Sequence, residues 1–166
     1  MDKKIEIIGT KNRYEIKKLT TDKIQQEKNN EKLDEKYYDE NNQIYLLENI
    51  NDFKYVSDSI KNKLSSYSQQ DKKRKLYDNN TITYNDVLDL LKTDKCLCKY
   101  CNNIVLLYYK YKLDKKQWTL DRIDNNIPHT KENVVICCLK CNLERKNMKQ
   151  ENYIYNKNLK IIKKST

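Results

Sequence analysis

The sequence predicts an α+β fold in which a C-terminal module held by two cysteine pairs follows a mainly helical extension. The pairs, Cys98-x-x-Cys101 and Cys138-x-x-Cys141, bracket a segment that alternates strand-like stretches with polar loops. The first half of the chain instead carries apolar residues at helical spacing. Because only 37% of the residues are hydrophobic and 35% are charged, we expect a small core.

Four regions are expected along the chain. The N-terminal segment is polar, with a short hairpin near 5–16 and a linker or solvated helix over 20–42. A helical lead-in then delivers the chain to the first cysteine pair. The expected boundaries are 1–50 for the polar segment, 51–95 for the lead-in, 96–148 for the cysteine module and 149–166 for an irregular basic tail.

Two helices are expected in the lead-in. The first carries an apolar stripe, with Asn51 or Asp52 available as its N-terminal cap. The second begins at Thr83, and Asp86 completes the pattern of a capping box. The stripe of the first helix, which we expect to pack on the rest of the fold, consists of Phe53, Val56, Ile60, Leu64 and Tyr67.

The cysteine module is expected to contain three strands and one helix. Ranges 104–111 and 117–123 are rich in β-branched, aromatic and leucine residues, which is typical of strands. After a loop over 124–131, a further strand is expected at 133–136. A helix is expected over 139–148, entered through the second cysteine pair.

The cysteine spacing predicts a structural zinc site. Four thiolates in two such pairs bind one Zn²⁺ tetrahedrally, and few other ions accept this set of ligands as well. The chain has six cysteines, so Cys96 and Cys137 are surplus. The two-residue knuckle closes the tighter turn, and the predicted ligands are therefore Cys98, Cys101, Cys138 and Cys141.

Disulfides are the alternative use of these cysteines. They would normally accompany a secretory signal, but the N-terminus has no apolar run long enough for a signal or a membrane span. We therefore expect a reducing, intracellular compartment and no membrane partner.

The positive charge is concentrated on the cysteine-bearing part. Residues 1–95 carry 19 Lys and Arg against 18 Asp and Glu, whereas residues 96–166 carry 15 against 6, a net of +9. A basic surface around a metal module is typical of nucleic-acid binding. The alternative is a solvated lysine-rich face. The basic run at 69–77 is likewise expected either to contact phosphates or to be solvated.

The order and spacing of these motifs resemble the HNH endonuclease family, in its ββα-metal, treble-clef form with a four-cysteine zinc. The resemblance covers residues 96–148, and 50–95 resembles the helical lead-in of some virus-encoded members. The matching segments are Cys98-Lys-Tyr-Cys101, Leu120-Asp-Arg-Ile-Asp124, Pro128-His-Thr-Lys-Glu-Asn133 and Cys138-Leu-Lys-Cys141-Asn142-x-x-Arg-Lys.

The resemblance implies metal-dependent hydrolysis of DNA phosphodiester bonds. Asp121 and Asn142 match the family positions that hold one divalent ion, Mg²⁺ or Mn²⁺, which polarises the phosphate and stabilises the departing 3′ oxygen. Asn133 matches the central asparagine, which ties the loop by hydrogen bonds and positions the base. An asparagine before a strand is otherwise an ordinary turn residue.

The chain departs from the family at the general base. The first histidine of the family signature is replaced by Arg122, which stays protonated and cannot accept a proton. The only histidine, His129, lies in the loop between the two core strands. His129 is predicted either to act as the base, or to cap the loop or contact a phosphate without chemistry. Arg122 is predicted to clamp a phosphate or to be a strand-surface charge.

We therefore expect a DNA endonuclease with structural Zn²⁺, catalytic Mg²⁺ or Mn²⁺ and no small-molecule cofactor. The alternatives are a zinc module that binds nucleic acid without cleaving it and a zinc-stabilised protein-interaction domain. An aspartate beside the phosphates favours the enzyme, because simple binding does not need it. The residues expected to contact nucleic acid are Arg122, Lys140, Arg145 and Lys146.

Overall fold

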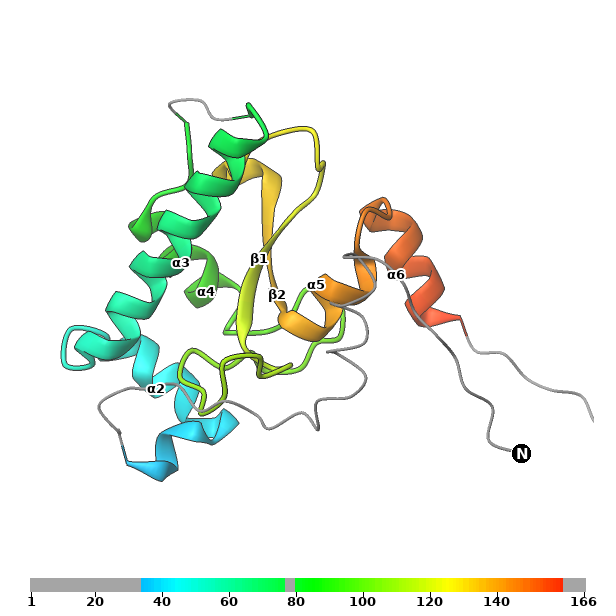
Figure 1. The fold of residues 1–166 in the computed structure, drawn as a ribbon. Helices are drawn as coiled ribbons and strands as arrows, with labels where there is room; N and C mark the ends of the chain where they lie inside the picture. Colours follow the sequence, from blue (N-terminus) through cyan, green and yellow to red (C-terminus); the bar gives the residue numbers. More distant parts are fainter. Residues whose placement is uncertain (1–33, 77–79, 160–166) are drawn as a thin grey trace, which may run out of the picture.

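The fold is mixed α+β, as predicted, with helices around one two-stranded antiparallel sheet (Figure 1). The computed structural model describes residues 34–76 and 80–159, so the hairpin predicted near 5–16 lies outside the described residues. The elements are α2 (Gln43–Glu48), α3 (Lys54–Lys73), α4 (Tyr84–Thr93), β1 (Trp118–Arg122), β2 (Val134–Cys138), α5 (Leu139–Arg145) and α6 (Gln150–Asn158), with 3₁₀ turns at Glu35–Tyr38, Glu40–Asn42 and Lys131–Asn133.

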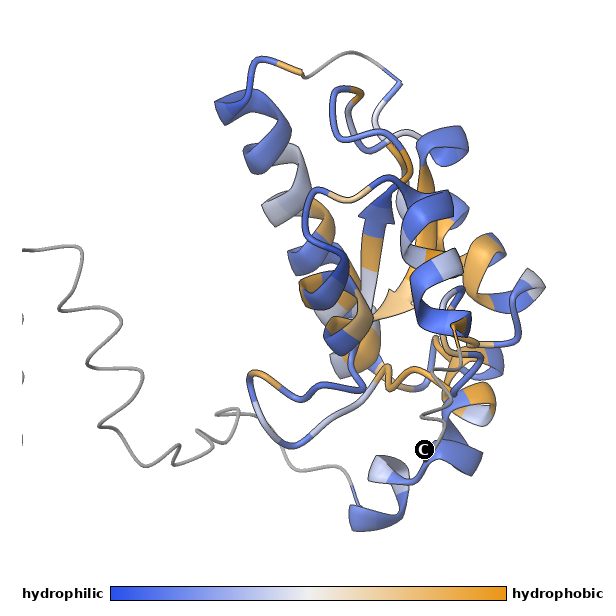
Figure 2. Ribbon diagram, turned by 90° about the vertical axis from the view of Figure 1, so that its right-hand side faces the viewer, coloured by the Kyte–Doolittle hydropathy of each residue, from blue (hydrophilic) through white to orange (hydrophobic). Residues whose placement is uncertain are grey.

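Helix α3 buries the apolar stripe that the sequence predicts. Val56 and Ile60 are fully buried, and Phe53, Leu64 and Tyr67 pack against the core in part. The hydrophobic residues of α3 accordingly face the sheet, whereas its exposed polar residues face outward (Figure 2). The predicted cap is wrong, because the N-cap position is Phe53 and no side chain caps the helix.

Helix α4 begins with the predicted capping box. The Thr83 hydroxyl accepts a hydrogen bond from the Asp86 backbone N–H at 3.2 Å, and the Asp86 carboxylate accepts one from the Thr83 N–H at 3.0 Å. These two bonds satisfy backbone donors that the first turn of a helix leaves free. The helix then buries Val87 and Leu91 completely.

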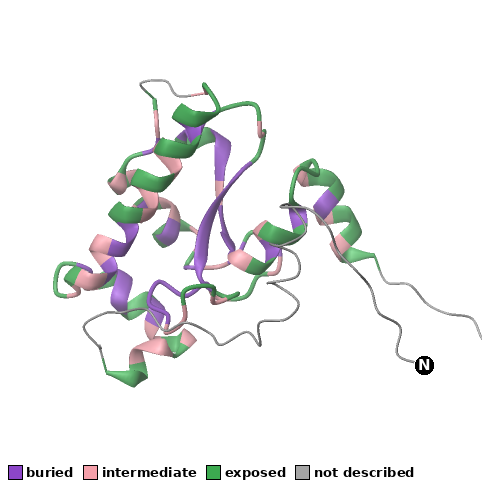
Figure 3. Ribbon diagram, viewed as in Figure 1, coloured by how far each residue is buried: buried purple, intermediate pink, exposed green. Residues whose placement is uncertain are grey.

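Strands β1 and β2 form the sheet, with Trp118 opposite Cys138 and Arg122 opposite Val134. Both strands are largely buried (Figure 3). The strand predicted over 104–111 is wrong, because this stretch forms only isolated bridges, at Ile104, Leu106 and Tyr111, within the described residues. Its apolar side chains are buried in a loop, so strand-like composition reflects burial here and not ladder pairing.

Side chains of α3 cover the outer edge of β1. The Tyr67 hydroxyl accepts a hydrogen bond from the Leu120 N–H at 3.0 Å. One turn earlier, the Lys63 ammonium donates to the Trp118 carbonyl and, at 3.0 Å, to the Gln117 side chain. An uncovered edge strand presents unpaired backbone groups to solvent or to other chains. Side chains of α3 therefore bond to backbone groups of β1 on the edge of this strand that does not pair with β2.

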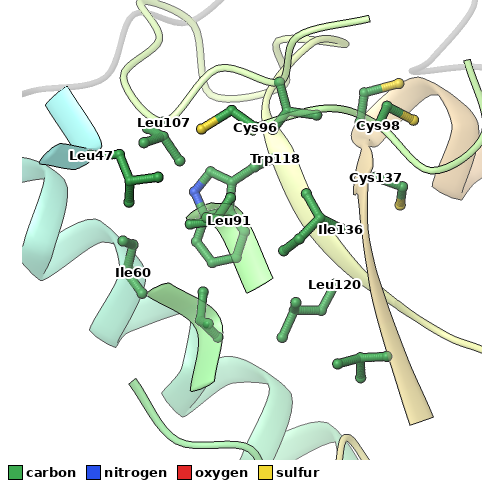
Figure 4. Close-up of a cluster of buried hydrophobic side chains, with 14 of the residues drawn as sticks. Leu47, Ile60, Leu91, Cys96, Cys98, Leu107, Trp118, Leu120, Ile136 and Cys137 are labelled. Atoms are coloured by element: carbon green, nitrogen blue, oxygen red, sulfur yellow. The ribbon is translucent and has the colours of Figure 1, made fainter. Parts of the chain in front are cut away.

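One hydrophobic core joins the lead-in to the cysteine module. Trp118 is fully buried and packs among Ile60, Leu91 and Leu107 (Figure 4). Leu46 of α2 belongs to the same cluster and is also fully buried. The boundary predicted at residue 50 therefore cuts through a single packed unit.

The C-terminal part of the described chain differs most from its prediction. The helix expected over 139–148 ends at Arg145, where Lys146 adopts a positive φ of 53°. Helix α6 then forms in the range expected to be irregular. Tyr153 is its only buried residue, and its ring meets that of Tyr100 edge to face at 5.0 Å. A helix with a single buried side chain has no apolar stripe to reveal it in the sequence.

Gln43 provides a test of how α2 is attached. Its amide oxygen accepts hydrogen bonds from the backbone N–H groups of Leu107 and Tyr108, at 2.8 and 3.2 Å, and the side chain is fully buried. Gln43→Ala leaves two buried donors without a partner, so we expect the free energy of unfolding to fall by roughly 2–5 kcal/mol. Chemical denaturation measures this change. The exposed Glu48→Ala on the same helix should stay within about 0.5 kcal/mol of the wild type, and equal effects would contradict the assignment.

Candidate metal and polar sites

The four predicted zinc ligands come together at one end of the sheet. The sulfur atoms of Cys98, Cys101, Cys138 and Cys141 all lie within 4.8 Å of one another. The first pair lies in the loop after α4, whereas Cys138 ends β2 and Cys141 lies in the first turn of α5. The predicted grouping is confirmed, and these thiols could hold one structural metal ion such as zinc.

The two surplus cysteines lie outside this group. Cys96 is fully buried among the core side chains near Leu107 (Figure 4), and burial raises the pKa of its thiol to about 12. Cys137 is also fully buried, its sulfur lies 3.2 Å from the Thr119 hydroxyl, and burial raises its pKa well above the usual value. Because neither thiol belongs to the group of four sulfur atoms and both side chains are buried in the core, Cys96 and Cys137 are described as core residues.

A lysine from α6 contacts the sulfur group. The Lys157 ammonium donates to the Cys141 sulfur at 3.0 Å and to the Tyr153 hydroxyl at 3.1 Å. The Tyr153 hydroxyl in turn donates to Glu144 of α5 at 2.9 Å. Four thiolates around a divalent ion carry a net negative charge, which a neighbouring ammonium offsets. Helix α6 is thus connected to the site by hydrogen bonds.

Asp121 lies beneath α5 in a buried ion pair. One carboxylate oxygen accepts a hydrogen bond from Arg145 Nη1 at 2.8 Å, and the other accepts one from the Tyr100 hydroxyl at 2.5 Å. Asp121 is 5% exposed and Arg145 is 1% exposed. Burial raises the pKa of Asp121, and the bonds from Tyr100 and Arg145 oppose this effect.

The predicted divalent-ion ligands do not fit a cation in this arrangement. Both oxygens of Asp121 are already bonded to donors, one of which is the cation of Arg145. The Asn142 amide nitrogen donates to the Thr119 hydroxyl at 3.1 Å and to the Leu120 carbonyl at 3.2 Å. Asp121 and Asn142 therefore lie on the same face of β1, as expected for a shared site, but serve as structural partners there.

His129 lies on the other face of the sheet, against α3. Its Nδ1 is 2.8 and 2.9 Å from the two carboxylate oxygens of Asp71, and its backbone N–H donates to Asp71 at 2.8 Å. The imidazole stacks on Tyr67 with ring centroids 4.7 Å apart. The side chains of His129 and Asp71 are 4% and 0% exposed. Burial lowers the pKa of His129, and the bond to Asp71 raises it in part.

Arg122 joins this second group. Its Nη1 lies 3.6 Å from the Asp71 carboxylate and donates to the Ile127 carbonyl at 3.4 Å. Consecutive residues of a strand point to opposite faces, so Arg122 faces α3 whereas Asp121 faces α5. The structure therefore brings His129 to Arg122 and Asp71, and does not bring it to Asp121 and Asn142.

Asn133 ties the loop that carries His129. Its amide nitrogen donates to the carbonyls of Asp124, Ile127 and Pro128 at 3.0–3.1 Å, and its oxygen accepts from the Asp124 N–H at 2.9 Å. These four bonds tie the two sides of the loop together, as the resemblance implies for this asparagine. The ordinary turn role does not require so many partners.

Two of the four expected nucleic-acid contacts are buried. Arg145 is 1% exposed and holds Asp121, so its expected role as a phosphate contact is corrected to a structural one. Arg122 is 7% exposed, which excludes the interpretation as a strand-surface charge. Lys140 and Lys146 of the α5 region are exposed and remain available to phosphates.

Sequence reasoning missed Asp71, although a signal was present. The buried positions of α3 recur every three or four residues, and Asp71 continues that spacing after Tyr67. A carboxylate in register with a buried face requires a buried partner, because an unpaired charge is costly there. In the sequence this position falls within the basic run 69–77, which was expected to contact phosphates or to be solvated. Comparisons with protein-family models, curated proteins and solved structures found no match.

The sulfur group leads to a prediction about metal content. Cys101→Ala removes one of four ligands, so we expect loss of bound zinc, as measured by native mass spectrometry, and a large fall in melting temperature. Cys96→Ala is the matched control, because this thiol is buried outside the group. It should retain one zinc per chain while losing some packing. Equal zinc contents in the two variants would contradict the assignment.

Proposed function

We propose that this chain is an HNH-like endonuclease with a treble-clef, ββα-metal module and a structural zinc. The order of elements supports the proposal: a first cysteine pair, strand β1, a loop, strand β2 and helix α5 entered through the second pair. Tetrahedral thiolate ligation makes zinc the preferred ion for this group. The reaction would be hydrolysis of a DNA phosphodiester bond.

The observation that carries the enzyme proposal is the buried pair of Asp71 and His129. With Nδ1–H donating to an ionised carboxylate, the imidazole is fixed in the tautomer whose Nε2 carries a lone pair. No hydrogen bond to Nε2 is found among the residues that the structure describes. A lowered pKa keeps the ring neutral near pH 7, so Nε2 can accept a proton there.

The proposed step uses this proton acceptor beside a cation. A water oxygen attacks phosphorus while its proton passes to His129 Nε2, the bond from phosphorus to the 3′ oxygen breaks, and the departing oxygen takes a proton from solvent. Arg122 lies beside Asp71 at the end of β1, where a guanidinium can offset the charge of the phosphate. The net charge of +9 over residues 96–166 favours an anionic polymer as substrate.

A second candidate is a module that binds nucleic acid without cleaving it. Two observations favour it: the His129 side chain is only 4% exposed, and both oxygens of Asp121 are bonded within the protein. Exposed lysines such as Lys140 and Lys146 would be enough for binding through phosphates.

The pH dependence of plasmid nicking tests the enzyme proposal. The wild-type rate should rise with pH through an apparent pKa below the usual imidazole value of about 6.5, because burial favours the neutral ring. His129→Gln should lower the rate by roughly 10²–10⁴-fold and remove this limb. Asp71→Asn should lower the rate by roughly 10²-fold or more and move the limb to lower pH, because Asp71 raises the pKa of His129.

Asp58→Asn is the matched control, since this aspartate lies on the same helix with its side chain 47% exposed. It should leave both the rate and the pH profile unchanged. An active His129→Gln protein with the wild-type pH profile would rule out the proposed base.

The salt dependence of DNA affinity tests whether the exposed lysines contact DNA phosphates. The logarithm of affinity should fall linearly with the logarithm of salt concentration, with about −0.9 in slope for each phosphate contact. Lys140→Ala and Lys146→Ala should each reduce the magnitude of this slope by about 1, without changing sequence preference. The control is Lys61→Ala on α3, which should leave the slope unchanged. Binding that does not depend on salt would contradict this surface.

A further inference from the structure

We propose that the ion pair of Asp121 and Arg145 takes the place of the divalent cation that the HNH resemblance implies. Asp121 is then the buried counter-ion of an arginine, and cleavage proceeds without Mg²⁺ or Mn²⁺ at this carboxylate. The part of this inference that concerns cleavage rests on the proposed function.

Both oxygens of the Asp121 carboxylate already have hydrogen-bond donors and are not free to bind a metal ion. Each of its oxygens accepts a hydrogen bond, from Arg145 on one side and from Tyr100 on the other. A magnesium ion needs oxygen ligands about 2.1 Å away in near-octahedral geometry. Such an ion would have to displace both donors, and it would meet the positive charge of Arg145 beside the same carboxylate.

Separating Arg145 from Asp121 is unfavourable. Its Nη2 donates to the Ile123 carbonyl at 2.9 Å, and its Nε is buried without a hydrogen-bond partner in the described structure. Asp121 is its one carboxylate partner among the described residues. Loss of that partner leaves a buried guanidinium uncompensated, which is strongly unfavourable. The arginine and the aspartate therefore stabilise each other, and a cation at Asp121 would oppose that stabilisation.

The position of Arg145 allows the ion pair to connect several elements of the fold. The arginine lies in the last turn of α5, and its two bonds reach Asp121, the penultimate residue of β1, and Ile123, the residue after the strand. Tyr100, which donates to the other oxygen, lies between the cysteines of the first pair. One carboxylate thus connects the first knuckle, strand β1 and helix α5.

Two measurements on the full-length, zinc-loaded protein test the inference. The first measurement follows the divalent ion. Binding of Mn²⁺ is measured by electron paramagnetic resonance, and plasmid nicking is measured both in EDTA and with added Mg²⁺. The zinc content of each sample is measured as well. We expect no stoichiometric Mn²⁺ site and nicking that persists in EDTA. One Mn²⁺ per chain in the wild type and none in Asp121→Asn, at equal melting temperatures, would overturn the inference, as would nicking that strictly requires the added ion.

The second measurement is a double-mutant cycle on melting temperature. Asp121→Asn and Arg145→Met should each lower the melting temperature by about 10 °C, because each leaves a buried group without its partner. The double variant should lose clearly less than the sum of the two. Additive effects, or a harmless Asp121→Asn, would overturn the structural role. If no nicking occurs under any condition, the proposed function fails, whereas Mn²⁺ binding and the cycle still decide this inference.

Discussion

The convergence of four sulfur atoms constrains the arrangement of the cysteine module more than any other contact. The two cysteine pairs come from opposite sides of the β1–β2 unit in sequence, yet their sulfurs lie within 4.8 Å of one another. This proximity fixes the end of β2, the start of α5 and the loop after α4 at one point. Four thiolates this close together would repel one another, and a bound cation such as zinc could offset that repulsion, to which the Lys157 ammonium adds a further positive charge.

The sequence predicted those parts of the fold in which local pattern and tertiary packing agree. The apolar stripe of α3, the capping box at Thr83 and the cysteine grouping are all present. The strand expected over 104–111 is absent because its apolar side chains are buried in a loop, and burial and ladder pairing leave the same composition. Helix α6 buries only Tyr153, and its other links to the cysteine module are hydrogen bonds of Tyr153 and Lys157, which produce no hydrophobic periodicity.

The candidate site was harder to predict than the fold, because buried charges find their partners only in three dimensions. Asp121 and Arg122 are neighbours in sequence, but strand alternation sends them to opposite faces, where Arg145 and Asp71 pair with them. The resemblance implied that Asp121 and Asn142 share one site, and in the structure both lie on the face of β1 that α5 covers. The sequence could not show that Arg145 of α5 donates a hydrogen bond to the Asp121 carboxylate. Nor could it show that Asp71, the partner of His129, lies on helix α3.

Helix α3 presents Lys63, Tyr67 and Asp71 on successive turns to β1 and to the histidine loop. The lead-in and the cysteine module therefore form one structural unit, because α3 covers the edge of β1 and orients the imidazole of His129. A gene fusion that transplanted only 96–148 onto another scaffold would carry the metal ligands but leave the strand edge and the histidine without these partners.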